Sequence, residues 1–179
     1  MCLSGLTQII YGIVMAGSAI LTTIALFAPG WNTIENNVTS LKFNSSSWKG
    51  LLPWSCLKIT EGQVCPEWGS LPGWLQCVTV CMILSLIVEV FAIVYNILTC
   101  LSCCCKKYII HPLTFFAGIS TILLAIAVIV YAANWSQFPN GDNGSQLGYA
   151  YWLAVGALIL SAADVVIGAI TVFLGDHCC

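Results

Sequence analysis

The chain has 179 residues, of which 59% are hydrophobic and 7% are charged, and its formal net charge is −2. Soluble domains carry about 25% charged residues, so this chain has too little polar surface to cover a water-soluble core. Arginine is absent, which excludes the basic stripe that nucleic-acid binding requires. With a mean hydropathy of +0.95, the composition indicates a membrane protein.

The first apolar run covers residues 6–28 and contains no charge. It is longer than the core of a signal peptide, which is about 7–15 residues, and no basic segment precedes it. We therefore expect an uncleaved membrane helix. Pro29 and Gly30 end the run, and Trp31 follows, a residue type favoured at the membrane–water interface.

A large polar loop follows at residues 29–72. Alternating polar and apolar residues at 40–44 and 57–60 predict a small antiparallel β-sheet. Cys56 and Cys65 enclose eight residues of this loop. In an oxidising compartment we expect a disulfide rather than two free thiols, which would stabilise the loop by about 2–3 kcal/mol.

Three further apolar runs follow, at residues 73–99, 112–133 and 149–174. A short polar segment and a second loop separate them, at residues 100–111 and 134–148. Runs of this length predict membrane helices. We therefore expect an all-α membrane protein: one membrane domain over residues 1–179, built as a left-handed four-helix transmembrane bundle that carries the small extracellular sheet.

Two signals predict the orientation of the bundle. Lys106 and Lys107 lie in the segment 100–111, and lysines in short loops mark the cytoplasmic side. Four Asn-x-Ser/Thr sequons lie in the other two loops, at Asn37, Asn44, Asn134 and Asn143. Glycosylation occurs in the secretory lumen, so we expect a multi-pass plasma-membrane protein with both termini cytoplasmic. Asn134 is so close to the third run that we expect it to stay unmodified.

Glu89 and Asp164 are the acids that interrupt the apolar runs. An acid in the middle of a membrane costs about 2.5–3.5 kcal/mol on insertion scales, so it faces the bundle or a partner. One interpretation is a docking point for another membrane protein. The other is an acid that is hydrogen-bonded to Ser, Thr or Tyr inside the bundle, or that is protonated.

Six cysteines lie at the predicted cytoplasmic edge of the membrane: Cys100, Cys103, Cys104, Cys105, Cys178 and Cys179. Cysteines beside membrane helices are candidates for S-palmitoylation. The alternatives are unmodified thiols or a zinc site completed by His111 or His177, although the spacing is not that of a zinc ribbon. We expect neither a metal nor a cofactor. The sequence also lacks a Gly-x-Ser-x-Gly motif, a P-loop and paired carboxylates with a base, so we expect no enzyme.

The first loop carries an early tryptophan, a Gly-Leu-Trp-like motif and two cysteines: Trp31, Gly50, Leu51, Trp54, Cys56 and Cys65. This pattern resembles the claudin superfamily, which includes peripheral myelin proteins and the gamma-type accessory subunits of channels and receptors. The four-helix plan matches over the whole chain. Residues 73–135, with the Cys-Cys-Cys-Lys-Lys turn, look most like the nematode claudin-like (Clc-like) group.

The sequence departs from the family pattern in several places. Leu52 and Pro53 interrupt the Gly-Leu-Trp motif, and Gln76-Cys77 stands where family members often carry an arginine. The chain has no long cytoplasmic tail and ends without a ligand for PDZ scaffolds, so no such partner is expected. The fourth run is also similar to the accessory-subunit branch.

The resemblance implies two functions. The first is a cell-junction protein that contributes to adhesion or to a paracellular barrier, with itself or a related claudin-like protein as its partner in cis or in trans. Fixed charges on its sheet would bias ion passage; the candidates are Lys58, Glu61 and Glu67. The alternative is an accessory subunit that packs against a pore-forming channel or receptor subunit, with Asp164 as a contact.

Overall fold

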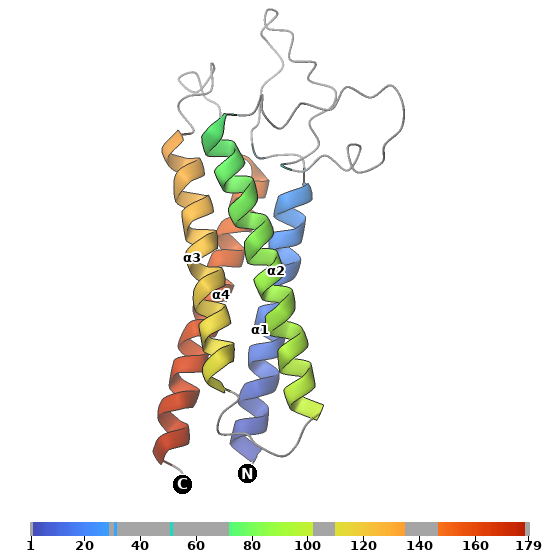
Figure 1. The fold of residues 1–179 in the computed structure, drawn as a ribbon, viewed down its shortest axis with the longest axis vertical. Coiled ribbons are helices and arrows are strands. Elements are labelled where there is room, and N and C mark those ends of the chain that lie inside the picture. Colours follow the sequence, from blue (N-terminus) through green and yellow to red (C-terminus); the bar gives the residue numbers. More distant parts are fainter. Residues whose placement is uncertain are drawn as a thin grey trace, which may run out of the picture.

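The computed structural model describes residues 2–28, 31, 51, 72–101, 110–134 and 147–177. Four helices make up almost all of this part of the chain: α1 (Cys2–Phe27), α2 (Gly73–Leu101), α3 (Ile110–Asn134) and α4 (Tyr149–His177). They run side by side, and the two chain termini lie at the same end of the bundle (Figure 1). The predicted sheet lies outside the described residues.

Each helix contains a segment that is long and apolar enough to cross a membrane. These segments are Thr7–Phe27, Gly73–Thr99, Pro112–Asn134 and Tyr149–Ile170. About 20 helical residues span the hydrocarbon core of a bilayer. A helix also satisfies its own backbone hydrogen bonds, which lipid cannot do. The prediction of an all-α, four-span membrane bundle is therefore confirmed.

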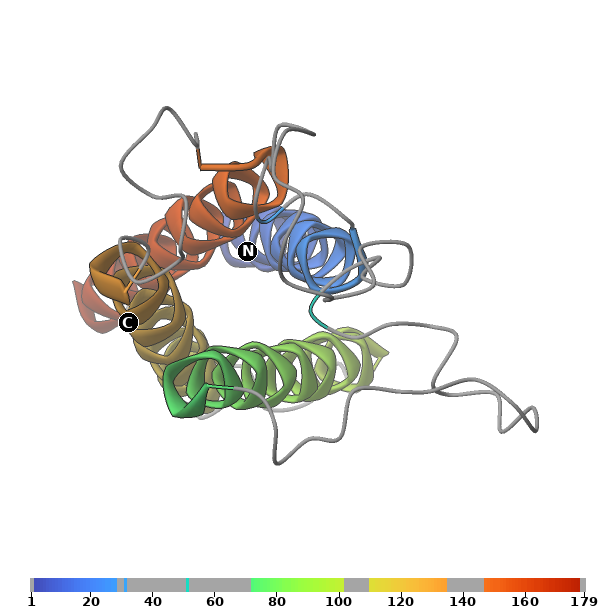
Figure 2. The same cartoon turned by 90° about the horizontal axis from the view of Figure 1, so that it is seen from above.

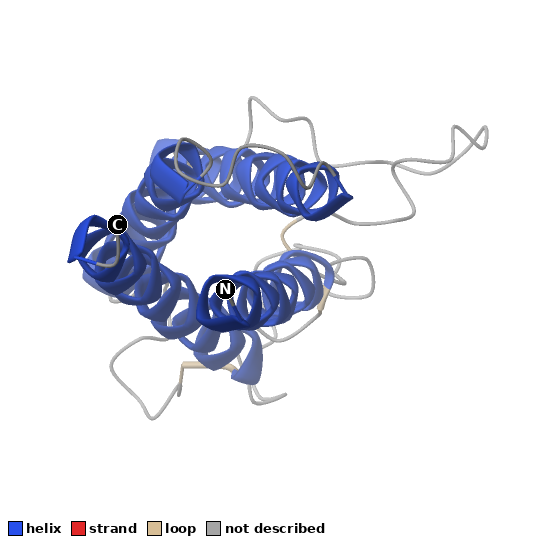
Figure 3. Cartoon of the chain, turned by 90° about the horizontal axis from the view of Figure 1, so that it is seen from below, coloured by secondary structure: helices blue, strands red, loops and turns tan. Residues whose placement is uncertain are grey.

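The helices form a ring in which neighbours in the sequence are neighbours in space. α1 packs on α2, α2 on α3 and α3 on α4, and α4 returns to pack on α1. The ring is seen from its two ends in Figures 2 and 3. α2 and α4 consequently face each other across the bundle axis, as do α1 and α3.

Buried positions recur in all four helices at alternating spacings of three and four residues. In α2 this stripe consists of residues 75, 78, 82, 85, 89, 92 and 96, with the buried residues 79 and 81 beside it, and in α4 of residues 150, 154, 157, 161, 164 and 168, with the buried residue 151 beside it. This 3.5-residue period is that of left-handed bundles, in which one narrow stripe of each helix stays on the core. The opposite faces expose large apolar side chains such as Ile13, Phe91 and Ile159, as a lipid-facing surface requires.

The core of the bundle has two apolar parts. One, at the end where α1 finishes and α2 begins, contains Leu26, Met82, Leu124 and Tyr131 among others. The other, nearer the chain termini, contains Tyr11, Met15, Ala92, Leu113 and Ala117. Between these two parts, each helix carries at least one buried polar side chain. These are Ser18 of α1, Ser85 and Glu89 of α2, Ser120 of α3 and Ser161 of α4. We call this group the polar layer.

Candidate functional site

Trp31, directly after α1, is anchored on the end of the bundle. Its indole nitrogen donates a hydrogen bond of 2.7 Å to the carbonyl oxygen of Ala25. Ala25 lies in the last turn of α1, where carbonyl groups have no partner within the helix. Because the indole supplies that missing donor, Trp31 caps the helix, and the residue as a whole is 6% exposed.

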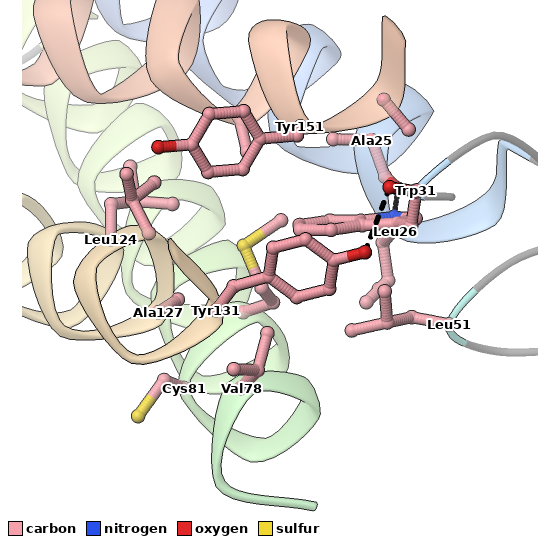
Figure 4. Close-up of a cluster of buried hydrophobic side chains, with 14 of the residues drawn as sticks. Ala25, Leu26, Trp31, Leu51, Val78, Cys81, Leu124, Ala127, Tyr131 and Tyr151 are labelled. Atoms are coloured by element: carbon pink, nitrogen blue, oxygen red, sulfur yellow. Dashed lines mark hydrogen bonds between the residues drawn. The ribbon is translucent and has the colours of Figure 1, made fainter. Parts of the chain in front are cut away.

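The backbone of Trp31 is held by the other side of the bundle. Its carbonyl oxygen accepts a hydrogen bond of 2.7 Å from the Tyr131 hydroxyl of α3. The same oxygen accepts one of 3.2 Å from the amide of Gly148, directly before α4. A carbonyl oxygen has two lone pairs, and both are used here. The start of the first loop is thereby tied to α1, to α3 and to the residue that precedes α4; Figure 4 shows the bonds with Ala25 and Tyr131.

Aromatic rings extend this contact into a cluster. The Trp31 and Tyr131 ring centroids are 4.8 Å apart at 64°, an edge-on arrangement. Trp74 of α2 and Tyr151 of α4 also pack on Tyr131, with centroid distances of 5.9 and 5.8 Å. Such pairs add about 0.5–1.5 kcal/mol each beyond the burial of their area. We call these four residues, together with Leu51, the head cluster.

Leu51 attaches a second point of the first loop to the same cluster. It is 7% exposed and belongs to the apolar core that contains Trp31 and Tyr131, and Figure 4 shows it beside Leu26 and Trp31. Trp31 and Leu51 are 20 positions apart in the sequence. The loop that they bracket is therefore fixed to the membrane bundle at both of these positions.

The polar layer is organised around Glu89, which is fully buried. Its Oε1 atom accepts hydrogen bonds from the hydroxyl groups of Ser18 at 2.7 Å, Ser120 at 3.0 Å and Thr22 at 3.4 Å. Ser85 lies 2.9 Å from Ser120 and extends the network. Hydroxyl groups from α1 and α3 thus converge on one oxygen of an acid from α2.

Asp164 of α4 is also fully buried, but its environment differs. Neither of its carboxylate oxygens has a hydrogen-bond partner among the described residues, and the Oε2 atom of Glu89 has none there either. Both acids lie on the inner stripes of their helices. In this arrangement neither carboxylate is presented to a protein outside the bundle.

The structure describes some of the other predicted sites in part. Asn134 ends α3, and its side-chain nitrogen donates a hydrogen bond of 2.8 Å to the carbonyl of Val130. The backbone of Cys100 lies in the last turn of α2. The remaining candidates lie outside the described residues: Asn37, Asn44, Gly50, Trp54, Cys56, Lys58, Glu61, Cys65, Glu67, Cys103, Cys104, Cys105, Asn143, Cys178 and Cys179.

Sequence reasoning missed Tyr131 and Tyr151 as partners of Trp31, and Thr22, Ser85 and Ser120 as part of the network around Glu89. A signal for these hydroxyl groups was present, because they stand at the same three- and four-residue spacing as the apolar core. Within the described part of the chain, no three His, Cys, Asp or Glu side chains gather into a site for a metal ion. The arrangement suits the anchoring of a loop rather than catalysis.

No curated protein matches the chain. Residues 1–179, however, match the family described as "Tight junction protein, Claudin-like". This is a family of structural membrane proteins, not of enzymes. The match covers the four helices, the head cluster and both loops, and it agrees with the resemblance seen in the first loop. The chain therefore belongs to the claudin-like family of tight junction proteins.

Proposed function

We propose that this protein acts at cell–cell junctions, where its first loop makes contacts that support adhesion or a paracellular barrier. The match to the claudin-like tight junction family over residues 1–179 carries this proposal. The head cluster supports it, because Trp31 and Leu51 are both buried on the bundle.

Anchoring of the loop has an energetic consequence for binding. A segment that is free in the monomer loses conformational entropy when a partner orders it, at about 0.5–1.5 kcal/mol for each immobilised side chain. Trp31 is already immobilised by its contacts with Ala25 and Tyr131. Part of the ordering cost is thus met before the partner arrives, which favours weak contacts that are repeated along a junction.

The chemistry of the contact surface is part of the same proposal. A Cys56–Cys65 disulfide would hold the sheet, and Lys58, Glu61 and Glu67 would place fixed charge beside it. Their mixed sign favours a barrier or adhesive surface over a strongly selective ion path. Within the family, the Cys103-Cys104-Cys105-Lys106-Lys107 turn favours the nematode claudin-like group.

The accessory-subunit alternative has less support. Its three arguments are a contact at Asp164, the similarity of the fourth helix to the accessory-subunit branch and the missing PDZ ligand, and the first loses weight because the Asp164 side chain is 0% exposed on the inner face of α4. The outer face of α4 instead carries apolar residues such as Trp152, Ile159 and Val166, which fit lipid as well as protein. The junction proposal is therefore the one that the geometry favours.

The experiment is expression in fibroblasts without junctions, mixed with non-expressing cells. We expect the protein to concentrate where two expressing cells meet. The signal there should exceed twice the signal of a single membrane, which is what two apposed membranes give without enrichment. Contacts with non-expressing cells should show no enrichment. Cys56→Ser should remove the enrichment, whereas Cys77→Ser, which changes an exposed free cysteine of α2, should preserve it.

An even distribution over the plasma membrane, at a normal surface amount, would argue against homotypic contact. Co-purification of a pore-forming subunit in mild detergent would then support the accessory role. Retention of the enrichment in Cys56→Ser would show that the contact does not depend on the proposed disulfide.

A further inference from the structure

A chain of short contacts between oxygen atoms crosses the bundle at the polar layer. The hydroxyl oxygen of Ser85 lies 2.9 Å from that of Ser120, and the Ser120 oxygen lies 3.0 Å from Oε1 of Glu89. The same Oε1 atom lies 2.7 Å from the hydroxyl oxygen of Ser18, which in turn lies 3.1 Å from the carbonyl oxygen of Ala157. These four contacts join groups from all four helices.

The hydroxyl group of Ser18 lies between two acceptor oxygens. A serine hydroxyl donates one hydrogen bond and accepts up to two, whereas an ionised carboxylate only accepts. If Glu89 is ionised, Ser18 must serve both the carboxylate at 2.7 Å and the Ala157 carbonyl at 3.1 Å with a single proton. One of the two contacts is then a close approach of two acceptors, which is unfavourable in a buried place.

A proton on Oε1 of Glu89 gives each of these contacts a proton of its own. The acid O–H then donates to Ser18, which reverses the direction of that hydrogen bond, and Ser18 donates to the Ala157 carbonyl. On the other side, Ser85 donates to Ser120, and Ser120 donates to Oε1, since the oxygen of an acid O–H still accepts. All the bonds then run in one direction, and hydrogen bonds in such a chain strengthen one another.

The surroundings of Glu89 also favour a neutral acid. The side chain is 0% exposed, and the described residues contain neither lysine nor arginine. Hydroxyl groups supply hydrogen bonds but no opposite charge, and a charged side chain in a membrane core is far more costly than a neutral one. Of the two carboxyl oxygens, Oε1 is the one that has an acceptor for the proton within 2.7 Å, the Ser18 hydroxyl.

We propose that Glu89 binds a proton in the assembled bundle and donates the resulting O–H to Ser18, so that the hydrogen-bond chain runs unbroken across all four helices. The neutral acid is then the joint between the Ser85–Ser120 contact and the contact of Ser18 with α4. The proposal does not depend on the junction role, because none of these residues belongs to the first loop or to the head cluster. It can therefore be tested on the isolated protein.

The test is infrared spectroscopy of the full chain, purified in detergent at neutral pH, because a protonated carboxylic acid has a carbonyl band that a carboxylate lacks. We expect this acid band in the unaltered chain, and Glu89→Gln should remove it or one component of it. Asp164→Asn is the matched control, because it changes another fully buried acid and should keep the Glu89 band. Absence of any acid band from the unaltered chain, or its full retention in Glu89→Gln, would overturn the proposal.

Ser18→Ala tests the place of the proton in the chain. It removes the acceptor of the acid O–H, so the frequency of the Glu89 band should change, and it removes the bond to Ala157, so the Tm should fall by about 3–6 °C. Thr23→Val should change neither, since the Thr23 hydroxyl is bonded to Ala19 within α1. A Glu89 band that keeps its frequency in Ser18→Ala would show that the proton does not lie between these two residues.

Discussion

At the scale of single residues, the Tyr131 hydroxyl joins α3 to the backbone that leaves α1. Replacing Tyr131 by Phe should lower the free energy of unfolding by about 1 kcal/mol, because one buried hydrogen bond is lost. The cost should stay near this value, since the Trp31 carbonyl retains the Gly148 amide as a donor. Equilibrium unfolding in mixed micelles would measure it.

Tyr149→Phe is the matched control, because Tyr149 begins α4 near the same end of the bundle but is 53% exposed. It should change the stability little. If the two substitutions had equal effects, the hydrogen bond from Tyr131 to Trp31 would contribute nothing specific, and the head cluster would be held by its ring contacts and by the hydrogen bonds of Trp31 with Ala25 and Gly148.

At the scale of helices, α3 and α4 lie in close contact where Gly168 faces Thr114. A Cβ atom at Gly168 would clash with the Thr114 Oγ1 atom and lie 3.1 Å from its Cβ. Threonine is β-branched and cannot easily rotate away. Gly168→Ala should therefore lower the free energy of unfolding by about 1–3 kcal/mol, as measured by unfolding in mixed micelles.

Gly118 on α3 offers the corresponding control. A Cβ atom there would meet nothing within 4 Å, so Gly118→Ala should be neutral or stabilise the helix by up to about 1 kcal/mol. Destabilisation by both substitutions would mean that helix packing at Gly168 is not the cause. Both residues are glycines inside an apolar run, and the sequence does not distinguish them.

At the scale of the whole molecule, four spans place both termini on one side of the membrane and both loops on the other (Figure 1). We expect glycans on the loop side at Asn37, Asn44 and Asn143. Asn134→Gln should leave the glycosylated mass unchanged, because the side-chain nitrogen that would carry the sugar is bonded to Val130 within α3. Gel mobility before and after enzymatic deglycosylation measures this.

Each of the other three Asn→Gln changes should remove one glycan, and epitopes added to either terminus should be detected only in permeabilised cells. Glycans on Asn134 would show that the last turn of α3 opens during synthesis. A terminal epitope detected on intact cells would reverse the proposed orientation and would remove the basis for a contact made by the first loop.

Four membrane spans and the claudin-like family could be predicted from the amino-acid sequence alone. Hydropathy is a local property, and in lipid a long apolar run must form a helix to satisfy its backbone. The family motif is also a local property, because Trp31 and Leu51 are identified from the residues that surround them in the sequence.

The contacts of these residues depend on how the helices pack. Trp31 meets Tyr131 a hundred positions away, and that pairing depends on the depth and rotation of α3. Glu89 and Asp164 look alike in sequence, as single acids in apolar runs. The packing gives Glu89 three hydroxyl groups and leaves Asp164 without a partner among the described residues. Partners of this kind come from other helices, so their position is fixed only when the bundle assembles.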